Sequence, residues 1–225
     1  MFFSKKNSNL NAVIFDMDGV LIDSEPIYIE IDKIMFKKYG LDSSKIDLED
    51  YIGINLYEMW EDLINKNQLE INDLDKIVED HVTNFYLALK NNKELQLMPG
   101  ILDWIKYFKE NNIKMMLASS SYPLIVQHIY SRFNLDNYMC GYIDINEIKN
   151  GKPAPDIFLQ AAKMMKVNTD NCLIIEDSEH GVNAAYNAGI KSIAFQQRAD
   201  ARQNLAKADM IIEEFNSKNL HTIIN

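Results

Sequence analysis

Two aspartates of the chain, Asp16 and Asp18, are separated by a single residue. They directly follow the apolar run 11–15, whose length and β-branched and aromatic content are typical of a buried strand. In an open parallel sheet, ligands bind outside the carboxyl ends of the strands, so both side chains would be accessible to a substrate. Gly19 follows them and allows the backbone to turn sharply.

Two carboxylates at this spacing repel each other, so either one of them takes up a proton or a cation binds and offsets the charge. A metal-bound Asp16 could act as a nucleophile, and a proton-carrying Asp18 could act as a general acid and then as a base. The alternative is that both aspartates only stabilise a turn after a strand.

Composition sets limits on the class of protein. The chain has 225 residues, of which 47% are hydrophobic, and its net charge of −10 argues against sequence-independent binding to nucleic acid. No run approaches a membrane span, and the first residues lack the apolar core of a signal peptide. Two cysteines, Cys140 and Cys172, are too few for a disulfide framework. We therefore expect a cytoplasmic protein that binds neither nucleic acid nor membrane.

The elements that must position these aspartates fall into two groups. After Pro26 the periodicity becomes helical and stays so to about Leu89, which predicts a small all-helical unit inserted after the first strand. Beyond the linker-like residues 91–94, strand and helix patterns alternate, which predicts an α/β core with a parallel sheet and helices on both faces. The expected domains are a core of residues 1–24 and 93–225 and a helical domain of residues 25–92.

Three of the predicted strands end in polar clusters. Besides the Asp16 cluster, these are the serines 119–121, after a strand at 113–117, and Glu176-Asp177, after a strand at 172–175. All carboxyl ends lie along one edge of a parallel sheet, so the clusters share one crevice if the strands are neighbours. The carboxylates of Asp16, Glu176 and Asp177 are the hard oxygen ligands that Mg²⁺ prefers.

Two further segments could hold a phosphate. Ser119 lies just before a predicted helix, where its hydroxyl and the following N–H groups can bind phosphate oxygens. The turn at 150–153 presents Lys152 as a positive point charge. Alternatively, the serines only cap a helix, the lysine is solvated, and the acidic pair begins a helix. The gathering of all these groups at strand ends favours the phosphate site.

These residues carry a family resemblance. Four segments in order resemble the four motifs of the haloacid dehalogenase (HAD) superfamily, and specifically of its beta-phosphoglucomutase-like phosphatases with a helical cap. The segments are D-M-D-G-V-L at 16–21, L-A-S-S-S at 117–121, N-G-K-P-A-P at 150–155 and I-I-E-D-S at 174–178. The resemblance covers nearly the whole chain and implies a Rossmann-like core with residues 25–92 as the cap.

The resemblance also implies roles at the metal. Asp16 would be the nucleophile that forms an aspartyl-phosphate, and Asp18 the general acid and base. Mg²⁺ would be held by the Asp16 carboxylate, the Asp18 backbone carbonyl and Asp177, with Glu176 bound directly or beside the metal.

For the phosphoryl group, the resemblance implies Ser119, the Ser120 N–H and Lys152 as ligands. Phosphoryl transfer needs mostly positioning and charge neutralisation, which these groups provide.

The superfamily contains both hydrolases and mutases, and three positions separate them here. Where the beta-phosphoglucomutase pattern has His, twelve residues after the nucleophile, this chain has Tyr28. Where the pattern has Arg, three residues after the cap-loop Gly53, it has Leu56, and Tyr122-Pro123 replaces Lys-Asn after the serines. The predicted cap contains none of the three arginines, Arg132, Arg198 and Arg202.

We therefore expect a monomeric, Mg²⁺-dependent phosphatase acting on a small phosphorylated metabolite such as a sugar phosphate. Tyr28 and the cap loop 47–60 would line the leaving-group side of the site. One alternative is a sugar-phosphate mutase of the beta-phosphoglucomutase type. The other is a non-catalytic binding protein on the same fold, which the presence of both Asp16 and Asp18 disfavours.

Overall fold

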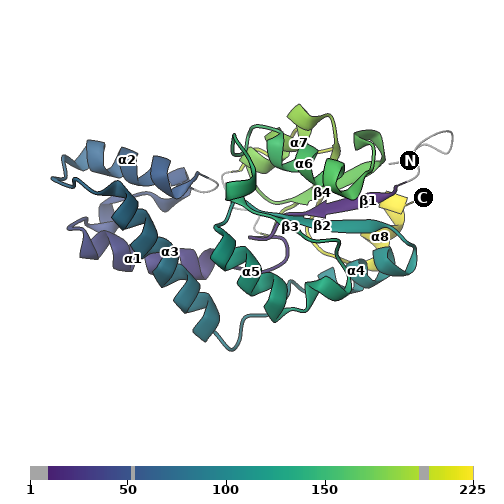
Figure 1. The fold of residues 1–225 in the computed structure, drawn as a ribbon, viewed down its shortest axis with the longest axis horizontal. Helices are drawn as coiled ribbons and strands as arrows, with labels where there is room; N and C mark the ends of the chain where they lie inside the picture. Colours follow the sequence, from purple (N-terminus) through teal and green to yellow (C-terminus); the bar gives the residue numbers. More distant parts are fainter. Residues whose placement is uncertain (1–9, 52–53, 198–202, 225) are drawn as a thin grey trace. The chain divides into compact units, whose positions relative to one another are not determined.

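The structure, a computed structural model, describes residues 10–51, 54–197 and 203–224 (Figure 1). The chain forms two compact units, one from residues up to 23 and from 96 onward, and the other from Ser24–Leu95. The predicted helical domain, 25–92, falls inside the second unit. Three residues used in the sequence argument lie outside the described ranges: Gly53, Arg198 and Arg202.

The first unit, the core, contains a six-stranded sheet in the order β3-β2-β1-β4-β5-β6, and every neighbouring pair is parallel. The predicted α/β class is confirmed, and the strands that end in polar clusters, β2, β1 and β4, are neighbours. The strands are β1 (Ala12–Phe15), β2 (Lys114–Ala118), β3 (Tyr142–Ile143), β4 (Cys172–Glu176), β5 (Lys191–Phe195) and β6 (Met210–Ile212).

Helices cover both faces of this sheet, with α6 and α7 on one side and α4 and α5 on the other (Figure 1). Side chains alternate across a strand, so Ile14 of β1 packs in the cluster that contains Phe158 of α6, while Phe15 contacts the ring of Phe108 on α4. All four residues of β1 are buried. The core helices are α4 (Ile101–Glu110), α5 (Pro123–Arg132), α6 (Asp156–Met165), α7 (Glu179–Ala188) and α8 (Ser217–Ile224).

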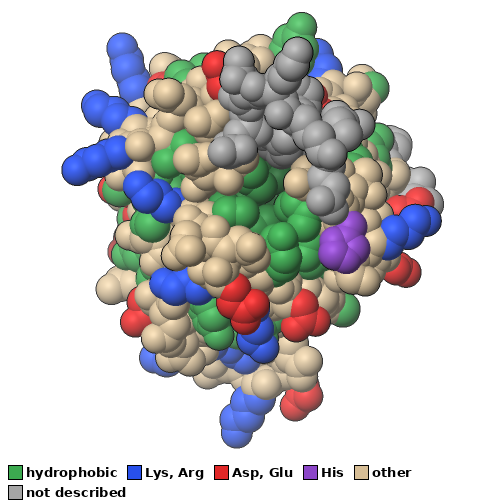
Figure 2. Space-filling view, turned by 90° about the vertical axis from the view of Figure 1, so that its right-hand side faces the viewer, with side chains coloured by type: hydrophobic (Ala, Val, Ile, Leu, Met, Phe, Trp, Pro, Cys, Tyr) green, Lys and Arg blue, Asp and Glu red, His purple; other side chains and the backbone are tan. Residues whose placement is uncertain are grey.

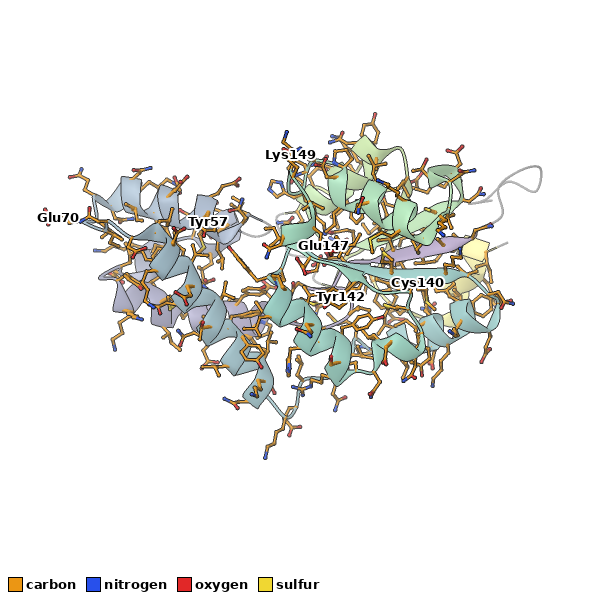
Figure 3. The ribbon with its side chains drawn as sticks, in the orientation of Figure 1. Tyr57, Glu70, Cys140, Tyr142, Glu147 and Lys149 are labelled. Atoms are coloured by element: carbon orange, nitrogen blue, oxygen red, sulfur yellow. The ribbon has the colours of Figure 1, made fainter. Side chains whose placement is uncertain are left out.

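Two short core elements had no counterpart in the sequence prediction, β3 and α8. A strand of two residues shows no alternation, so its pairing with β2, Leu117 with Tyr142 and Ala118 with Ile143, appears only in the folded chain. The Tyr142 ring then packs 5.1 Å from that of Tyr130 on α5 (Figure 3).

The chain segments that leave and re-enter the core lie side by side within it. Ile22 forms an antiparallel bridge with Leu97, and the Met98 N–H donates to the Leu21 carbonyl at 2.8 Å. Asp23, the last residue of this part of the core, accepts a hydrogen bond from the Gln197 side chain at 3.0 Å. The two core segments that flank the insertion are therefore bonded to each other and, through Gln197, to the segment that follows β5.

The second unit consists of α1 (Glu25–Lys38), α2 (Leu56–Asn67) and α3 (Leu74–Asn91), with short 3₁₀ turns at Ser43–Lys45 and Leu48–Tyr51. Trp60 of α2 donates its indole N–H to Nδ1 of the buried His81 on α3 at 3.1 Å. The other ring nitrogen of His81 lies 3.2 Å from Asp32 of α1. One buried histidine thus connects all three helices. Among the described residues, none of the helices has the length and apolar content needed to cross a membrane.

Candidate active site

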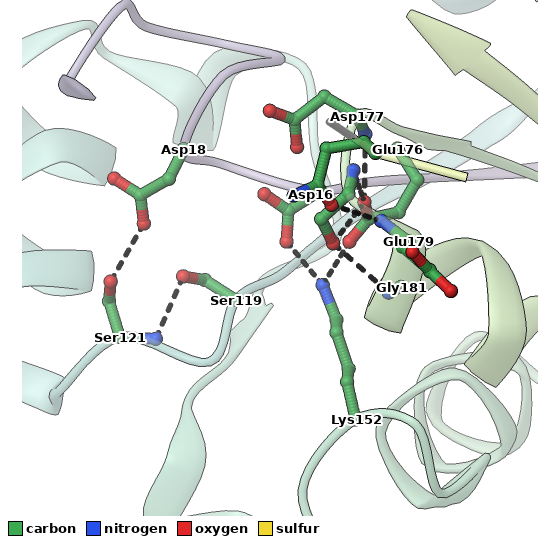
Figure 4. A network of polar contacts seen from close by, with 11 residues as sticks. Asp16, Asp18, Ser119, Ser121, Lys152, Glu176, Asp177, Glu179 and Gly181 are labelled. Atoms are coloured by element: carbon green, nitrogen blue, oxygen red, sulfur yellow. Dashed lines mark hydrogen bonds and ion pairs between the residues drawn. The ribbon is translucent and has the colours of Figure 1, made fainter. Parts of the chain in front are cut away.

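The polar residues that the sequence places at strand ends gather at the carboxyl edge of the core sheet (Figure 4). Asp16 follows β1, Ser119 follows β2, and Glu176 and Asp177 lie at the end of β4. The Asp16 N–H donates to the Ile175 carbonyl at 2.9 Å, which aligns the ends of the two central strands. Convergence at one edge is a direct consequence of parallel pairing in register.

Three carboxylates lie next to one another, those of Asp16, Glu176 and Asp177. One oxygen of each lies within 4.8 Å of the others. Lys152 reaches this group from the loop before α6, and its Nζ lies 2.5 Å from Asp16 Oδ1 and 2.5 Å from Glu176 Oε1 (Figure 4). Only 6% of the Lys152 side chain is exposed, so the ion pairs are shielded from water.

Burial dominates the electrostatics of the cluster. It raises the pKa of Asp16 to about 8; Lys152 opposes this rise, and Glu176 and Asp18 reinforce it. Burial likewise raises the pKa of Asp177, and the charges of Glu176 and Asp16 add to the effect. Burial disfavours the charged form of Lys152, but the Asp16 and Glu176 carboxylates outweigh it and raise its pKa. One ammonium group does not balance this many carboxylates, so the residues fit an additional cation.

The carboxylates differ in how many of their oxygens accept hydrogen bonds from other groups of the protein. Oε1 of Glu176 accepts from Lys152, and Oε2 accepts from the N–H groups of Asp177 and Ser178 at 2.7 Å and from the Ser178 hydroxyl at 3.0 Å. A Cβ at Gly181 would overlap the Glu176 carboxylate, so glycine is needed there. Within the described ranges, the Asp177 carboxylate and Asp16 Oδ2 have no hydrogen-bond donor.

Gly19 makes room for the acidic cluster. Its backbone φ is +76°, a value that residues with a side chain rarely adopt. A Cβ at this position would also overlap the Asp177 carboxylate. The sharp turn after Asp18 therefore brings bare backbone against Asp177, in agreement with the turn predicted at this glycine.

The serine run contributes a contact that the sequence reasoning missed. Ser119 is fully buried and its hydroxyl accepts from the Ser121 N–H at 3.0 Å. The Ser121 hydroxyl donates to Asp18 Oδ2 at 2.7 Å (Figure 4). A serine two residues before an N–H can accept a hydrogen bond from it in a local turn, and this spacing of serines was the available signal. Ser120, between them, is partly exposed.

Tyr28 belongs to the helical unit, where its ring stacks on Phe85 of α3 at a centroid distance of 3.7 Å and an interplanar angle of 18°. This contact fixes the ring within that unit. Its contact with a substrate stays a prediction.

The fold and this cluster match a known class of enzymes. Residues 13–195 match the family model of haloacid dehalogenase-like hydrolases. The chain belongs to this family and is therefore a hydrolase by class.

Relatives of known name cover most of the chain. A phosphorylated carbohydrates phosphatase of Thermotoga maritima is 32% identical over 188 residues, covering 82% of this chain and 84% of that protein. A beta-phosphoglucomutase of Bacillus subtilis is 27% identical over 209 residues, covering 91% and 90%. The crystal structure of a beta-phosphoglucomutase from Clostridium difficile superposes with a TM-score of 0.81 at 25% identity, covering 96% of this chain and 97% of that one.

Proposed function

We propose that this chain is a Mg²⁺-dependent phosphatase that hydrolyses a small phosphomonoester, such as a sugar phosphate, through an aspartyl-phosphate on Asp16. The observation that carries the proposal is the state of the Asp16 carboxylate. One of its oxygens is paired with the buried Lys152, and the other has no hydrogen-bond donor among the described residues. A buried carboxylate held in this way is a positioned nucleophile.

The donor set fits Mg²⁺, with Asp16, Asp177 and the Asp18 backbone carbonyl as ligands. When bound, the metal supplies positive charge next to the transferring phosphoryl oxygens. Glu176, whose oxygens are already used by Lys152 and by the 177–178 backbone, has the role of holding Lys152 in place.

Side chains carry out the phosphoryl transfer and the proton transfers. The Asp16 carboxylate forms a bond to phosphorus as the bond to the leaving-group oxygen breaks, and Asp18 gives that oxygen a proton. Asp18 then takes a proton from the water that attacks the aspartyl-phosphate, which regenerates Asp16. Ser119, the Ser120 N–H and Lys152 neutralise the phosphoryl oxygens, and this preorganised charge lowers the barrier.

A phosphatase is favoured over a mutase because the described part of the helical unit offers no arginine for a second phosphate. The sequence identity to this chain is also higher for the Thermotoga relative that is named as a phosphatase, 32%, than for the Bacillus mutase, 27%. The test is to measure inorganic phosphate released from a panel of sugar phosphates, phosphoglycolate and glycerol phosphate, with and without Mg²⁺. Isomerisation of beta-glucose 1-phosphate without phosphate release would establish the mutase instead.

Four features predicted from the sequence accompany this proposal. They are the role of residues 25–92 as a cap, the placement of Tyr28 and loop 47–60 on the leaving-group side, a monomeric state and a cytoplasmic location.

Replacing Ser121 by Ala should lower kcat about tenfold and leave KM nearly unchanged, because the proton carrier Asp18 loses the hydroxyl that orients it. Steady-state phosphate release measures both constants. Ser121→Thr keeps a hydroxyl and should recover part of kcat. Ser131→Ala, at an exposed position on α5, is the control. An unchanged kcat in Ser121→Ala would show that the Asp18 contact has no catalytic role.

Stability without metal should fall as the pH rises from about 4 to about 8. The folded pKa of Asp16, about 8, lies above the unfolded value, so the protonated form stabilises the fold and this contribution is lost through that window. Mg²⁺ binds the ionised carboxylates, so the rise in Tm that it causes should be larger at pH 8.5 than at pH 6. Thermal unfolding at both pH values, with Mg²⁺ or EDTA, measures this. An equal rise at both pH values would contradict the assignment.

A further inference from the structure

A polar cavity that is open to solvent lies at the opposite, amino-terminal edge of the core sheet, and none of its lining residues is buried. Its volume is about 450 Å³, within the range of small-molecule sites. It is lined where β1, β2 and β4 begin, by Asn11 before β1, Lys114 at the start of β2 and Asn171 before β4. Figure 2 looks onto this edge, where hydrophobic side chains lie at the centre and side chains of both charges lie around them.

The backbone around the cavity is already hydrogen-bonded. The Asn11 N–H donates to the Asn171 carbonyl at 2.9 Å, and the Lys114 N–H donates to the Asn11 carbonyl at 2.9 Å. The Asn171 N–H in turn donates to the Asn168 carbonyl at 2.9 Å. The three strand starts are thus tied together through their backbone.

Most of the side chains that line the cavity are polar, and three are apolar. Of the ten lining residues, five are Asn, two are Lys, and none is acidic. Lys114 Nζ donates at 2.8 Å to the carbonyl of Met165, which is the last residue of α6. The Asn111 side chain donates to the Tyr107 carbonyl at 2.8 Å. The remaining polar side chains have no hydrogen-bond or ion-pair partner within residues 10–51, 54–197 and 203–224: Asn11, Asn112, Lys166, Asn168 and Asn171.

Charge and geometry define the ligand. The chain has a net charge of −10, yet this cavity presents two ammonium groups without a carboxylate, which favours an anion. Asparagine amides both donate and accept, which suits hydroxyl groups. Asn11 at the cavity and Asp16 are five residues apart along an extended strand, roughly 17 Å at about 3.3 Å per residue, so the ligand of the cavity cannot be the reacting phosphoester.

We propose that this cavity is a second binding site, for a small polyhydroxylated anion that carries a carboxylate or a phosphate. The inference does not depend on the reaction at Asp16. β1, β2 and β4 run from this cavity to the catalytic edge, so a ligand here lies at the starts of the strands whose other ends carry the catalytic residues.

The probes are gluconate and 6-phosphogluconate, titrated into the metal-free, ¹⁵N-labelled full chain and followed by NMR. Saturable shifts are expected in the carboxamide signals of Asn112, Asn168 and Asn171. Lys166→Asn should weaken binding about tenfold, because it removes a charge-assisted hydrogen bond. Asparagine suits the left-handed conformation of this residue, φ +55°, so the variant should fold. Lys163→Gln, at an exposed position on α6, the helix that ends just before Lys166, should bind like the wild type.

A second variant, Asn168→Asp, places a carboxylate in the cavity and should also weaken binding. The proposal is overturned if neither probe causes saturable shifts at these asparagines, or if shifts occur only around Ser119 and Lys152. It is also overturned if Lys163→Gln weakens binding as much as Lys166→Asn, since binding would then reflect general surface charge.

Discussion

Replacing Asp16 by Asn should reduce phosphate release by at least roughly 10³-fold while the chain stays folded. An amide cannot form the acyl-phosphate bond, and it also removes the carboxylate that pairs with Lys152. The fold should tolerate the change because Asp16 is buried with a raised pKa, so a neutral side chain of the same size relieves repulsion with Glu176 and Asp18. Circular dichroism and thermal unfolding test the fold, and steady-state phosphate release tests the activity.

The matched control is Asp103→Asn, the same chemical change at an exposed position in the first turn of α4. It should leave turnover unchanged. This experiment also separates an enzyme from a binding protein on the same fold. Retention of more than a few per cent of activity by a folded Asp16→Asn protein would exclude Asp16 as the nucleophile.

Replacing Lys152 by Met should have the second largest effect, a fall in kcat of roughly 10²–10³-fold. The methionine fills similar space next to Phe158 but removes the only ammonium group that contacts the Asp16 and Glu176 carboxylates among the described residues. Leaving buried carboxylates without their cation should also lower the free energy of unfolding by roughly 3 kcal/mol at pH 8. The loss should be smaller at pH 5, where Asp16 takes up a proton instead.

Chemical denaturation at both pH values measures this loss, and Mg²⁺ should restore part of it by returning positive charge to the cluster. Lys149→Met is the control, because Lys149 is exposed and lies just before the turn that holds Lys152 (Figure 3). Equal losses of stability at pH 5 and pH 8 would show that packing, and not the ion pairs, accounts for the effect of the Lys152 change.

The sequence alone determined the type and order of most elements and the residues at the strand ends. Periodicity is a local property, so the runs that became β1, β2, β4 and β5 were recognisable one at a time. Their polar endings, Asp16, Ser119 and Glu176, were equally visible, because a residue that follows a buried strand must lie at an edge of the sheet.

Only the tertiary structure decided which of these residues contact one another, and so which role each has in the site. Lys152 lies 136 residues from Asp16 in the chain, and its simultaneous contact with Glu176 depends on how α6 and its loop pack over β1 and β2. The bond from Ser121 to Asp18 depends in the same way on β2 lying next to β1 in the sheet. Such contacts join residues that are distant in the chain, so their distances are set by strand order and helix packing, which no local pattern encodes.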